Sequence, residues 1–143
     1  MLAVYDWRVM GFMSRFAWNI DIPEMVEFYN EHITTNHLDV GPGTGFLIDE
    51  ADLPDEARVV LLDPNLNVLE HASKRLARLS PATVEADVLK PLPVEGPFDS
   101  ACLANVLHCL PGPIETKSRA FENIAAVLAP DGVLAGSTVL GES

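Results

Sequence analysis

The stretch Leu38-Asp39-Val40-Gly41-Pro42-Gly43-Thr44-Gly45-Phe46 joins a short apolar run to a loop with glycine at every second position. Glycine adopts positive φ without a steric penalty and lets a ligand come close to the backbone. An apolar run directly before such a turn is typical of a buried strand. We therefore predict a central strand from His37 to Val40 that ends in a ligand-binding turn.

The spacing of the glycines argues against two common nucleotide sites. A dinucleotide-binding loop has glycine at its first, third and sixth positions, whereas here Gly45 stands at the fifth position and Phe46 at the sixth. A phosphate-binding P-loop would end in Gly-Lys-Ser or Gly-Lys-Thr, and this loop does not. The spacing of the loop therefore disfavours the binding of NAD and the binding of a phosphate group.

The rest of the chain alternates between strand-like and helix-like segments. Apolar runs predict strands at residues 59–62, 82–86, 98–104 and 133–140, and helical spacing predicts helices at 66–79 and 114–128. Such alternation predicts an α/β fold with a doubly wound, mostly parallel sheet. Ligands of such sheets bind at the carboxyl ends of the strands.

The beginning of the chain is predicted to be helical. Four large apolar residues recur there at helical spacing: Tyr5, Val9, Phe12 and Phe16. Asp21-Ile22-Pro23-Glu24 has the spacing of a capping box and predicts the start of a second helix. We therefore expect two N-terminal helices over residues 1–36 and an α/β core over residues 37–143.

Composition and charge exclude several classes of protein. The 143 residues, 48% of them hydrophobic, are enough for one buried core, and 21 acidic against 9 basic residues give a net charge of -12. Because no Lys/Arg cluster stands out, nucleic acid is a poor partner. Asp6, Arg8 and Arg15 interrupt the apolar N-terminal segment well short of a membrane span, and it is not a signal peptide. Cys102 and Cys109 form no CxxC pair, so we expect reduced thiols in a cytoplasmic protein and no metal site.

Asp63 ends the predicted strand 59–62 and follows Gly41 by 22 residues. In a doubly wound sheet, a carboxylate at this place can accept hydrogen bonds from both hydroxyls of a ribose. It indicates a nucleoside without choosing the cofactor, because NAD proteins use an acidic residue in the same way. The alternative is that Asp63 caps the helix that begins near Leu66.

Asp39, Gly41, Gly43 and Gly45 resemble the first motif of the class I, Rossmann-like S-adenosylmethionine-dependent methyltransferases, an acidic residue followed by alternating glycines. Three later stretches are similar to further motifs of that family: Glu85-Ala86-Asp87-Val88, residues 98–108 and residues 128–134. The resemblance spans roughly residues 37–140. It implies S-adenosylmethionine as cofactor, S-adenosylhomocysteine as product, and a methyltransferase activity on a small-molecule or lipid-like acceptor.

The resemblance also implies which residues hold the cofactor. The Asp87 carboxylate would accept the adenine amino group, the Val88 backbone N–H would donate to the ring, and Ala104 and Asn105 would lie beside the methionine part. The implied cofactor-binding residues are Asp39, Gly41, Pro42, Gly43, Thr44, Gly45, Asp63, Pro64, Asp87, Val88, Ala104 and Asn105.

Methyl transfer from a sulfonium needs mainly correct positioning, so the absence of a catalytic triad is uninformative. A base is needed only where the acceptor must lose a proton, and His108 is the candidate, although a histidine in an apolar run is more often packed or capping. Candidates for acceptor contacts are Tyr5, Arg15, Trp18 and Tyr29. The alternative for each of these four is a place in the core.

Members of the resembled family continue past the fifth strand with a helix and two more strands, so the chain resembles a truncated form. The strand 133–140 would then be an exposed apolar edge that pairs with a second copy, and we expect a homodimer. The alternative is that the N-terminal segment folds back over this edge. Three classes of function stay open: an active methyltransferase, a cofactor-binding module without turnover, and an NAD- or nucleotide-binding domain.

Overall fold

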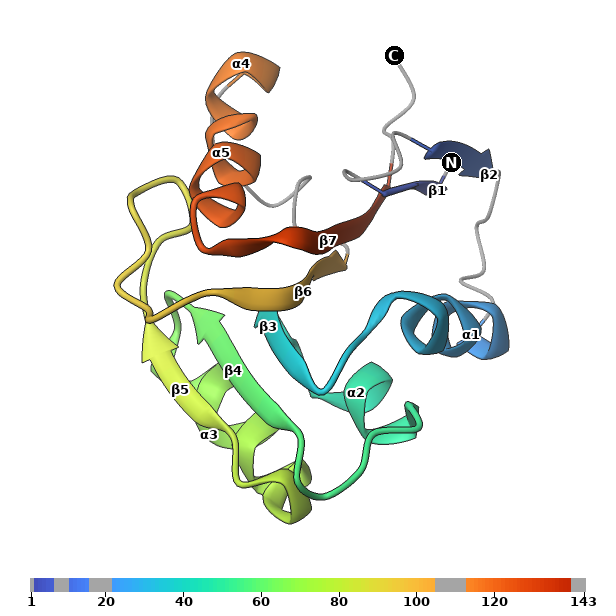
Figure 1. Ribbon diagram of the computed structural model, residues 1–143, viewed down its shortest axis with the longest axis vertical. Helices are drawn as coiled ribbons and strands as arrows, with labels where there is room; N and C mark the ends of the chain where they lie inside the picture. The colour runs from blue at the N-terminus through green and yellow to red at the C-terminus, as the bar shows by residue number, and fades with distance from the viewer. Residues whose placement is uncertain (1, 7–10, 16–21, 105–112, 140–143) are drawn as a thin grey trace.

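The computed structural model describes residues 2–6, 11–15, 22–104 and 113–139. Within these ranges seven strands form one sheet, in the order β2-β1-β7-β6-β3-β4-β5 (Figure 1). The strands are β1 (Leu2–Asp6), β2 (Gly11–Arg15), β3 (Asn36–Val40), β4 (Arg58–Asp63), β5 (Ala82–Glu85), β6 (Phe98–Ala104) and β7 (Leu128–Val139). The helices are α1 (Ile22–His32), α2 (Phe46–Glu50), α3 (Leu66–Arg75), the 3-10 helix η1 (Ala77–Leu79), α4 (Ile114–Lys117) and α5 (Arg119–Ala125).

Strands β3 to β7 run parallel to one another. The chain moves outward from β3 to β4 and β5, then returns to the other side of β3 with β6 and β7. The direction of winding therefore reverses between β3 and β6, and ligands of open α/β sheets bind at such a switch point. The prediction of a doubly wound, mostly parallel sheet is confirmed.

Alternate residues of the strands pack into two separate apolar layers. In β4, Val59 and Leu61 join the layer that contains residues of α1, α2 and α3, whereas Val60 and Leu62 join the layer that contains residues of α5. Helices thus cover both faces of the sheet, with α3 across β4 and β5 (Figure 1). A strand buried on both faces must be apolar at nearly every position, as β4 is.

Helix α3 follows the sequence prediction closely. Asn65 caps it, because its side chain accepts the backbone N–H of Asn67 at 2.9 Å, and two basic residues stand in the last turn. Its buried face carries Leu69 and Ala72, and η1 continues it to Leu79. The cap is Asn65 rather than Asp63, so the alternative that Asp63 caps this helix is wrong.

The predicted first N-terminal helix is wrong where the structure describes it. Leu2–Asp6 and Gly11–Arg15 are strands that pair with each other as an antiparallel hairpin. The predicted second helix is confirmed as α1. Hydrogen bonding to a neighbouring strand outweighs apolar spacing over such short segments, because spacing alone does not offer partners for the backbone. The division of the chain at residue 36 stays a prediction, although β1 and β2 lie in the same sheet as the core.

The expectation that the last parallel strand has an unpaired edge is also wrong, because the N-terminal segment pairs with that edge. Strand β1 pairs antiparallel with β7, from Leu2 opposite Val139 to Asp6 opposite Ala135. The alternative in which the N-terminal segment covers this edge is the one observed. The argument for a homodimer through β7 therefore loses its premise.

The predicted helix 114–128 is divided into α4 and α5, and β7 begins at Leu128, before the predicted strand 133–140. The pairing of β6 with β7 shifts in register between Phe98, which lies opposite Leu128, and Ser100, which lies opposite Val133. Within the described ranges, no helix has the length and apolar character that a membrane span requires.

Candidate functional site

The glycine loop leaves the carboxyl end of β3 at the switch point. Gly41, Gly43 and Gly45 have φ values of 67°, 58° and 79°, which glycine alone adopts without strain. The Gly41 N–H donates to the Leu62 carbonyl of β4 at 2.8 Å, and the Gly45 N–H donates to the Pro42 carbonyl at 3.0 Å. The first bond fastens the loop to the neighbouring strand, and the second closes the turn before α2.

Gly45 and Gly43 have different surroundings. A Cβ at Gly45 would lie 3.3 Å from Leu76 Cδ1 and 3.4 Å from the Ala72 carbonyl oxygen, so this glycine lets the start of α2 pack tightly on α3. A Cβ at Gly43 would meet no atom of the described residues within 4 Å. Gly43 and its neighbour Thr44 are exposed, so the loop is open to a ligand at this point.

Asp63 stands at the end of β4, beside this loop. Its Oδ1 accepts the backbone N–H of Asn65 at 2.8 Å, which turns the chain towards α3 past the exposed Pro64. Partial burial raises the pKa of the Asp63 carboxyl, and the Asn65 N–H opposes that rise. The carboxylate is thus held by one backbone bond, with further acceptor capacity for a ligand.

The loop after β5 brings Asp87 and Val88 to the same edge of the sheet. The register pairs Asp63 with Glu85, and the Ala86 N–H donates to the Asp63 carbonyl at 3.2 Å. Asp87 is exposed and accepts the Leu89 N–H through Oδ1 at 2.9 Å. The Val88 side chain is buried, and its carbonyl accepts from Asn123 Nδ2 of α5 at 2.9 Å. Helix α5, which packs on the face of the sheet opposite to α3, therefore anchors this loop.

Asp39 is buried in β3, one residue before the strand ends. Its Oδ2 accepts from Tyr29 OH of α1 at 3.2 Å and lies 3.1 Å from His37 Nε2. Desolvation by burial, followed by the nearby Asp39 charge, raises the pKa of the Tyr29 phenol, so Tyr29 stays protonated and donates. Tyr29 is 2% exposed. This placement disfavours direct contact with an acceptor and connects Tyr29 instead to Asp39, two residues before the first glycine of the loop.

The structure locates only some of the other residues that were predicted to contact the acceptor or the methionine part of the cofactor. Ala104 is the last residue of β6, at the same edge of the sheet as the glycine loop. The register places Arg15 opposite Leu2, and Leu2 opposite Val139 at the carboxyl end of β7, while Tyr5 lies opposite Gly136. Three predicted residues lie outside the described residues: Trp18, Asn105 and His108.

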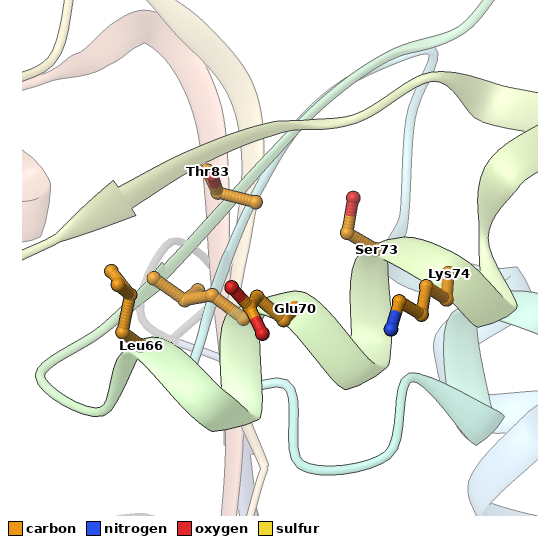
Figure 2. A pocket seen from close by; sticks show the side chains of 6 residues that line it. Leu66, Glu70, Ser73, Lys74 and Thr83 are labelled. Atoms are coloured by element: carbon orange, nitrogen blue, oxygen red, sulfur yellow. The ribbon is translucent and has the colours of Figure 1, made fainter.

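A surface hollow of about 480 Å³ lies between α3 and β5. Figure 2 shows Glu70, Ser73 and Lys74 of α3 facing it, with Thr83 of β5 across from them. Its lining includes no residue of the glycine loop. Strand ends, rather than this hollow, therefore define the candidate site, and the hollow approaches it only at Leu66, near Asp63.

The sequence interpretation missed part of the buried surroundings of Asp39. His37 and Ser100 are 0% and 1% exposed, and His37 Nδ1 lies 2.8 Å from Ser100 Oγ. The signal was present in β3, because His37 and Asp39 stand two residues apart and so share one face of a buried strand. Two polar residues on a buried face require polar partners. Among the described residues, no group of three or more His, Cys, Asp or Glu side chains is arranged to hold a metal ion.

Comparison with known proteins identifies the family. A family model described as a methyltransferase domain matches residues 38–134, from the middle of β3 into β7. The chain belongs to the methyltransferase domain family. The match contains the glycine loop, Asp63 and Asp87, so the features that carried the resemblance lie inside the methyltransferase domain.

Individual relatives agree with this assignment. This chain is 39% identical over 141 residues to a demethylluteothin O-methyltransferase of Streptomyces thioluteus, and the alignment covers 97% of this chain and 61% of that protein. It is 37% identical over 145 residues to a physcion biosynthesis cluster O-methyltransferase of Aspergillus chevalieri, covering 99% and 65%. The chain thus spans less than two thirds of the length of these two relatives.

A solved structure shares the fold. The N-methyltransferase NodS of Bradyrhizobium japonicum WM9, in complex with S-adenosyl-L-homocysteine, superposes with a TM-score of 0.67 over 83% of this chain and 64% of that chain. The two sequences are 20% identical, so this likeness concerns the fold.

Proposed function

We propose that this chain binds S-adenosylmethionine at the carboxyl edge of β3, β4 and β5 and belongs to an enzyme that methylates a small-molecule acceptor. The observation that carries the proposal is the glycine loop at the switch point, with three positive φ values and a backbone bond from Gly41 to β4. Both named O-methyltransferase relatives contain sequence that aligns with nearly all of this chain, which supports the same class of activity.

The residues present fit such a cofactor. Gly43 leaves the loop open, Asp63 keeps acceptor capacity for ribose hydroxyls, and Asp87 follows at the next strand end. Asp39 has a second carboxylate oxygen, Oδ1, that accepts no hydrogen bond from the described residues. A buried carboxylate oxygen without a donor is costly, so a ligand that carries donors is favoured here.

Charge favours this cofactor over a dinucleotide. Asp39, Asp63 and Asp87 gather carboxylates at one edge, which suits a ligand with a positive sulfonium and an ammonium group. Helix α2 follows the loop as Phe46-Leu47-Ile48-Asp49-Glu50, and its first turn carries one acidic residue, Asp49, and no basic one. Negative charge at a helix start repels a pyrophosphate. The NAD alternative is therefore disfavoured by the loop spacing and by the charge of α2.

When bound, S-adenosylmethionine supplies a methyl group on a positively charged sulfur, which is already activated for displacement. The residues of this chain would bind and orient. Asp63 would hold the ribose, Asp87 and the Val88 N–H the adenine, and the glycine loop with Ala104 and Asn105 the methionine part. Correct positioning of two reactants contributes roughly 7 to 11 kcal/mol to lowering a barrier, so positioning can supply much of the catalysis.

Acceptor binding and proton removal stay predictions. Arg15, Tyr5 and Trp18 are the candidates for acceptor contacts, and the register places the Arg15 backbone near the carboxyl end of β7. His108 remains the candidate base for an acceptor that must lose a proton. A cofactor-binding module without turnover is the alternative function.

Calorimetry with S-adenosylhomocysteine, S-adenosylmethionine and NAD tests the proposal. We expect heat of binding with the first two ligands and none with NAD. Binding of NAD alone would contradict the proposed cofactor. Release of S-adenosylhomocysteine from S-adenosylmethionine with a set of phenol and amine acceptors would then separate an active enzyme from a module that only binds.

Three further expectations belong to the same proposal. We expect the chain to act in the cytoplasm, because its two cysteines form no CxxC pair, and to make no use of nucleic acid, because its net charge is -12 and no Lys/Arg cluster stands out. The homodimer also stays a prediction, although β1 now occupies the β7 edge on which it was based. Light scattering at micromolar concentration would test it, and a monomeric mass would contradict it.

A further inference from the structure

A chain of hydrogen bonds runs through the layer between the sheet and α1. Thr34 N–H donates to Ser100 Oγ at 2.9 Å, and Ser100 Oγ lies 2.8 Å from His37 Nδ1. His37 Nε2 lies 3.1 Å from Asp39 Oδ2, which also accepts from Tyr29 OH at 3.2 Å. The four residues from Ser100 to Tyr29 are at most 2% exposed. This network of hydrogen bonds thus connects β6, β3 and α1 next to the start of the glycine loop.

The chemistry of the groups fixes most of the bond directions. An ionised carboxylate only accepts, so both Tyr29 OH and His37 Nε2–H donate to Asp39. The raised pKa of the Tyr29 phenol agrees with this direction. The direction of the contact between His37 Nδ1 and Ser100 Oγ follows the tautomer of His37, and Ser100 Oγ also lies 2.9 Å from Thr34 Oγ1. The imidazole ring is therefore held from both nitrogens, and it can rotate only by breaking two buried bonds.

Ser100, His37 and Asp39 include the residue types of a hydrolase triad but cannot act as one. The Ser100 hydroxyl already contacts three groups of the fold, the Thr34 N–H, Thr34 Oγ1 and His37 Nδ1, so it has no capacity left for a substrate carbonyl. The carboxylate also contacts Nε2 of the histidine and the serine contacts Nδ1, which reverses the arrangement that a hydrolase triad uses. This network of hydrogen bonds must therefore either stabilise the fold or position Asp39.

Burial of so many polar groups calls for a reason beyond stability. A buried charged network seldom stabilises a fold more than apolar residues of the same size would. Two donors here converge on a single oxygen of Asp39, and Asp39 is two residues before the first glycine of the loop. Its other oxygen, Oδ1, receives no hydrogen bond within the described part of the chain. One oxygen is thus fixed, and the other keeps its acceptor capacity.

We propose that His37 and Tyr29 are positioning residues for the cofactor site, holding Asp39 through Oδ2 so that Oδ1 can accept a donor from the bound ligand. This inference rests on the proposed function. It assigns α1 a part in ligand binding through Tyr29, although Tyr29 itself is buried. The rotamer of Asp39, which sets the place of Oδ1, is then decided by α1 and by His37 together.

A double-mutant cycle on ligand affinity tests the inference. The dissociation constant of S-adenosylhomocysteine is measured by calorimetry for the wild type, Tyr29→Phe, Asp39→Asn and the double variant. We expect Tyr29→Phe to weaken binding roughly tenfold, the effect of one lost hydrogen bond to a charged group. In the Asp39→Asn background, we expect the same change to weaken binding less than twofold, because Tyr29 acts through Asp39.

Two substitutions of His37 sharpen the test. The amide of His37→Gln can place a donor near the position of Nε2 and should keep affinity within about threefold of the wild type. His37→Asn can reach towards Ser100 but not to Asp39, and it should weaken binding roughly tenfold. Ile124→Val in α5, buried on the opposite face of the sheet, is the control: it lowers the melting temperature and leaves the dissociation constant unchanged.

The outcomes separate this inference from the proposed function. A wild type that binds no S-adenosylhomocysteine contradicts the proposed function itself. A wild type that binds, with folded Tyr29→Phe of equal affinity, overturns only the positioning role. Fully additive effects of Tyr29→Phe and Asp39→Asn also overturn it. If a His37 variant does not fold, the Tyr29 cycle decides alone, because loss of one hydroxyl leaves the packing of the ring in place.

Discussion

The two faces of β3 differ sharply, although both belong to one strand of five residues, Asn36–Val40. Leu38 and Val40 pack into the apolar layer that contains α5. His37 and Asp39 lie on the other face and are bonded to groups of β6 and α1. The first face is satisfied by any apolar residues of suitable volume. The second needs particular donors at particular places, so we assign stability mainly to the first and ligand positioning to the second.

The largest expected effect concerns the apolar face. Leu38→Ala removes a side chain that is 0% exposed and should lower the free energy of unfolding by about 2 to 5 kcal/mol, because a cavity is left in the core. Urea unfolding measures this loss. The matched control is Leu66→Ala, since Leu66 is 53% exposed and its loss should change stability by less than about 0.5 kcal/mol. Equal losses for the two leucines would contradict the assignment.

The next effect concerns the strand ends of the polar side. Asp63→Ala should weaken the binding of S-adenosylhomocysteine by about 1.5 to 3 kcal/mol, roughly ten- to hundredfold, through loss of hydrogen bonds to a charged group. Calorimetry measures the change. Asp99→Ala removes an exposed carboxylate near the opposite end of β6 and should leave affinity unchanged. His108→Ala should also weaken binding far less than Asp63→Ala. Equal affinities of these two variants for S-adenosylhomocysteine would contradict this ranking.

A smaller effect distinguishes the two ends of the glycine loop. Alanine at either Gly43 or Gly45 must adopt positive φ, which costs about 1 to 2 kcal/mol. Only Gly45→Ala also brings a Cβ to 3.3 Å from Leu76 Cδ1. We therefore expect thermal unfolding to show a greater loss of stability for Gly45→Ala than for Gly43→Ala. The reverse order would indicate that α2 and α3 are less tightly packed than described.

The smallest expected effect is a pH dependence that belongs to Asp63. Because burial raises its pKa in the folded chain, the folded state holds this proton more firmly than the unfolded chain does. The Asp63 contribution to stability is therefore largest at low pH and declines as pH rises from the ordinary value through the raised one.

Affinity should follow the opposite course at the same residue. Ribose hydroxyls donate to the ionised carboxylate, so binding should weaken as pH falls through the raised pKa of Asp63. Titration of S-adenosylhomocysteine between neutral and acid pH, compared with Asp63→Asn, measures this dependence. A wild type and an Asp63→Asn variant with the same pH profile would show that the ionisation of Asp63 does not control binding.

The features that sequence alone predicted are those determined by neighbouring residues. The apolar run before Gly41 and the apolar positions of α3 follow from local periodicity, and the structure places them as expected. The family match over residues 38–134 agrees with the motif order that pointed to a methyltransferase. Local patterns suffice here because each strand end carries its own polar residue, and parallel strands bring these ends to one edge.

The features that sequence missed depend on residues far apart in the chain. Ser100 meets His37 across 63 positions, and no local pattern announces that contact. The N-terminal helix was predicted from apolar spacing, whereas Leu2–Asp6 pairs with β7 at the other end of the chain. Spacing describes which residues are apolar but not which backbone groups will find partners.

By itself, then, the sequence determined the alternation of strands and helices, the glycine loop and the acidic residues at the strand ends, because each is specified by adjacent residues. Only the tertiary structure decided that β1 covers the edge of β7 and that Tyr29 and His37 share one oxygen of Asp39. The physical reason is that a buried polar group must find its partner wherever the fold brings one. That partner is chosen by packing in three dimensions.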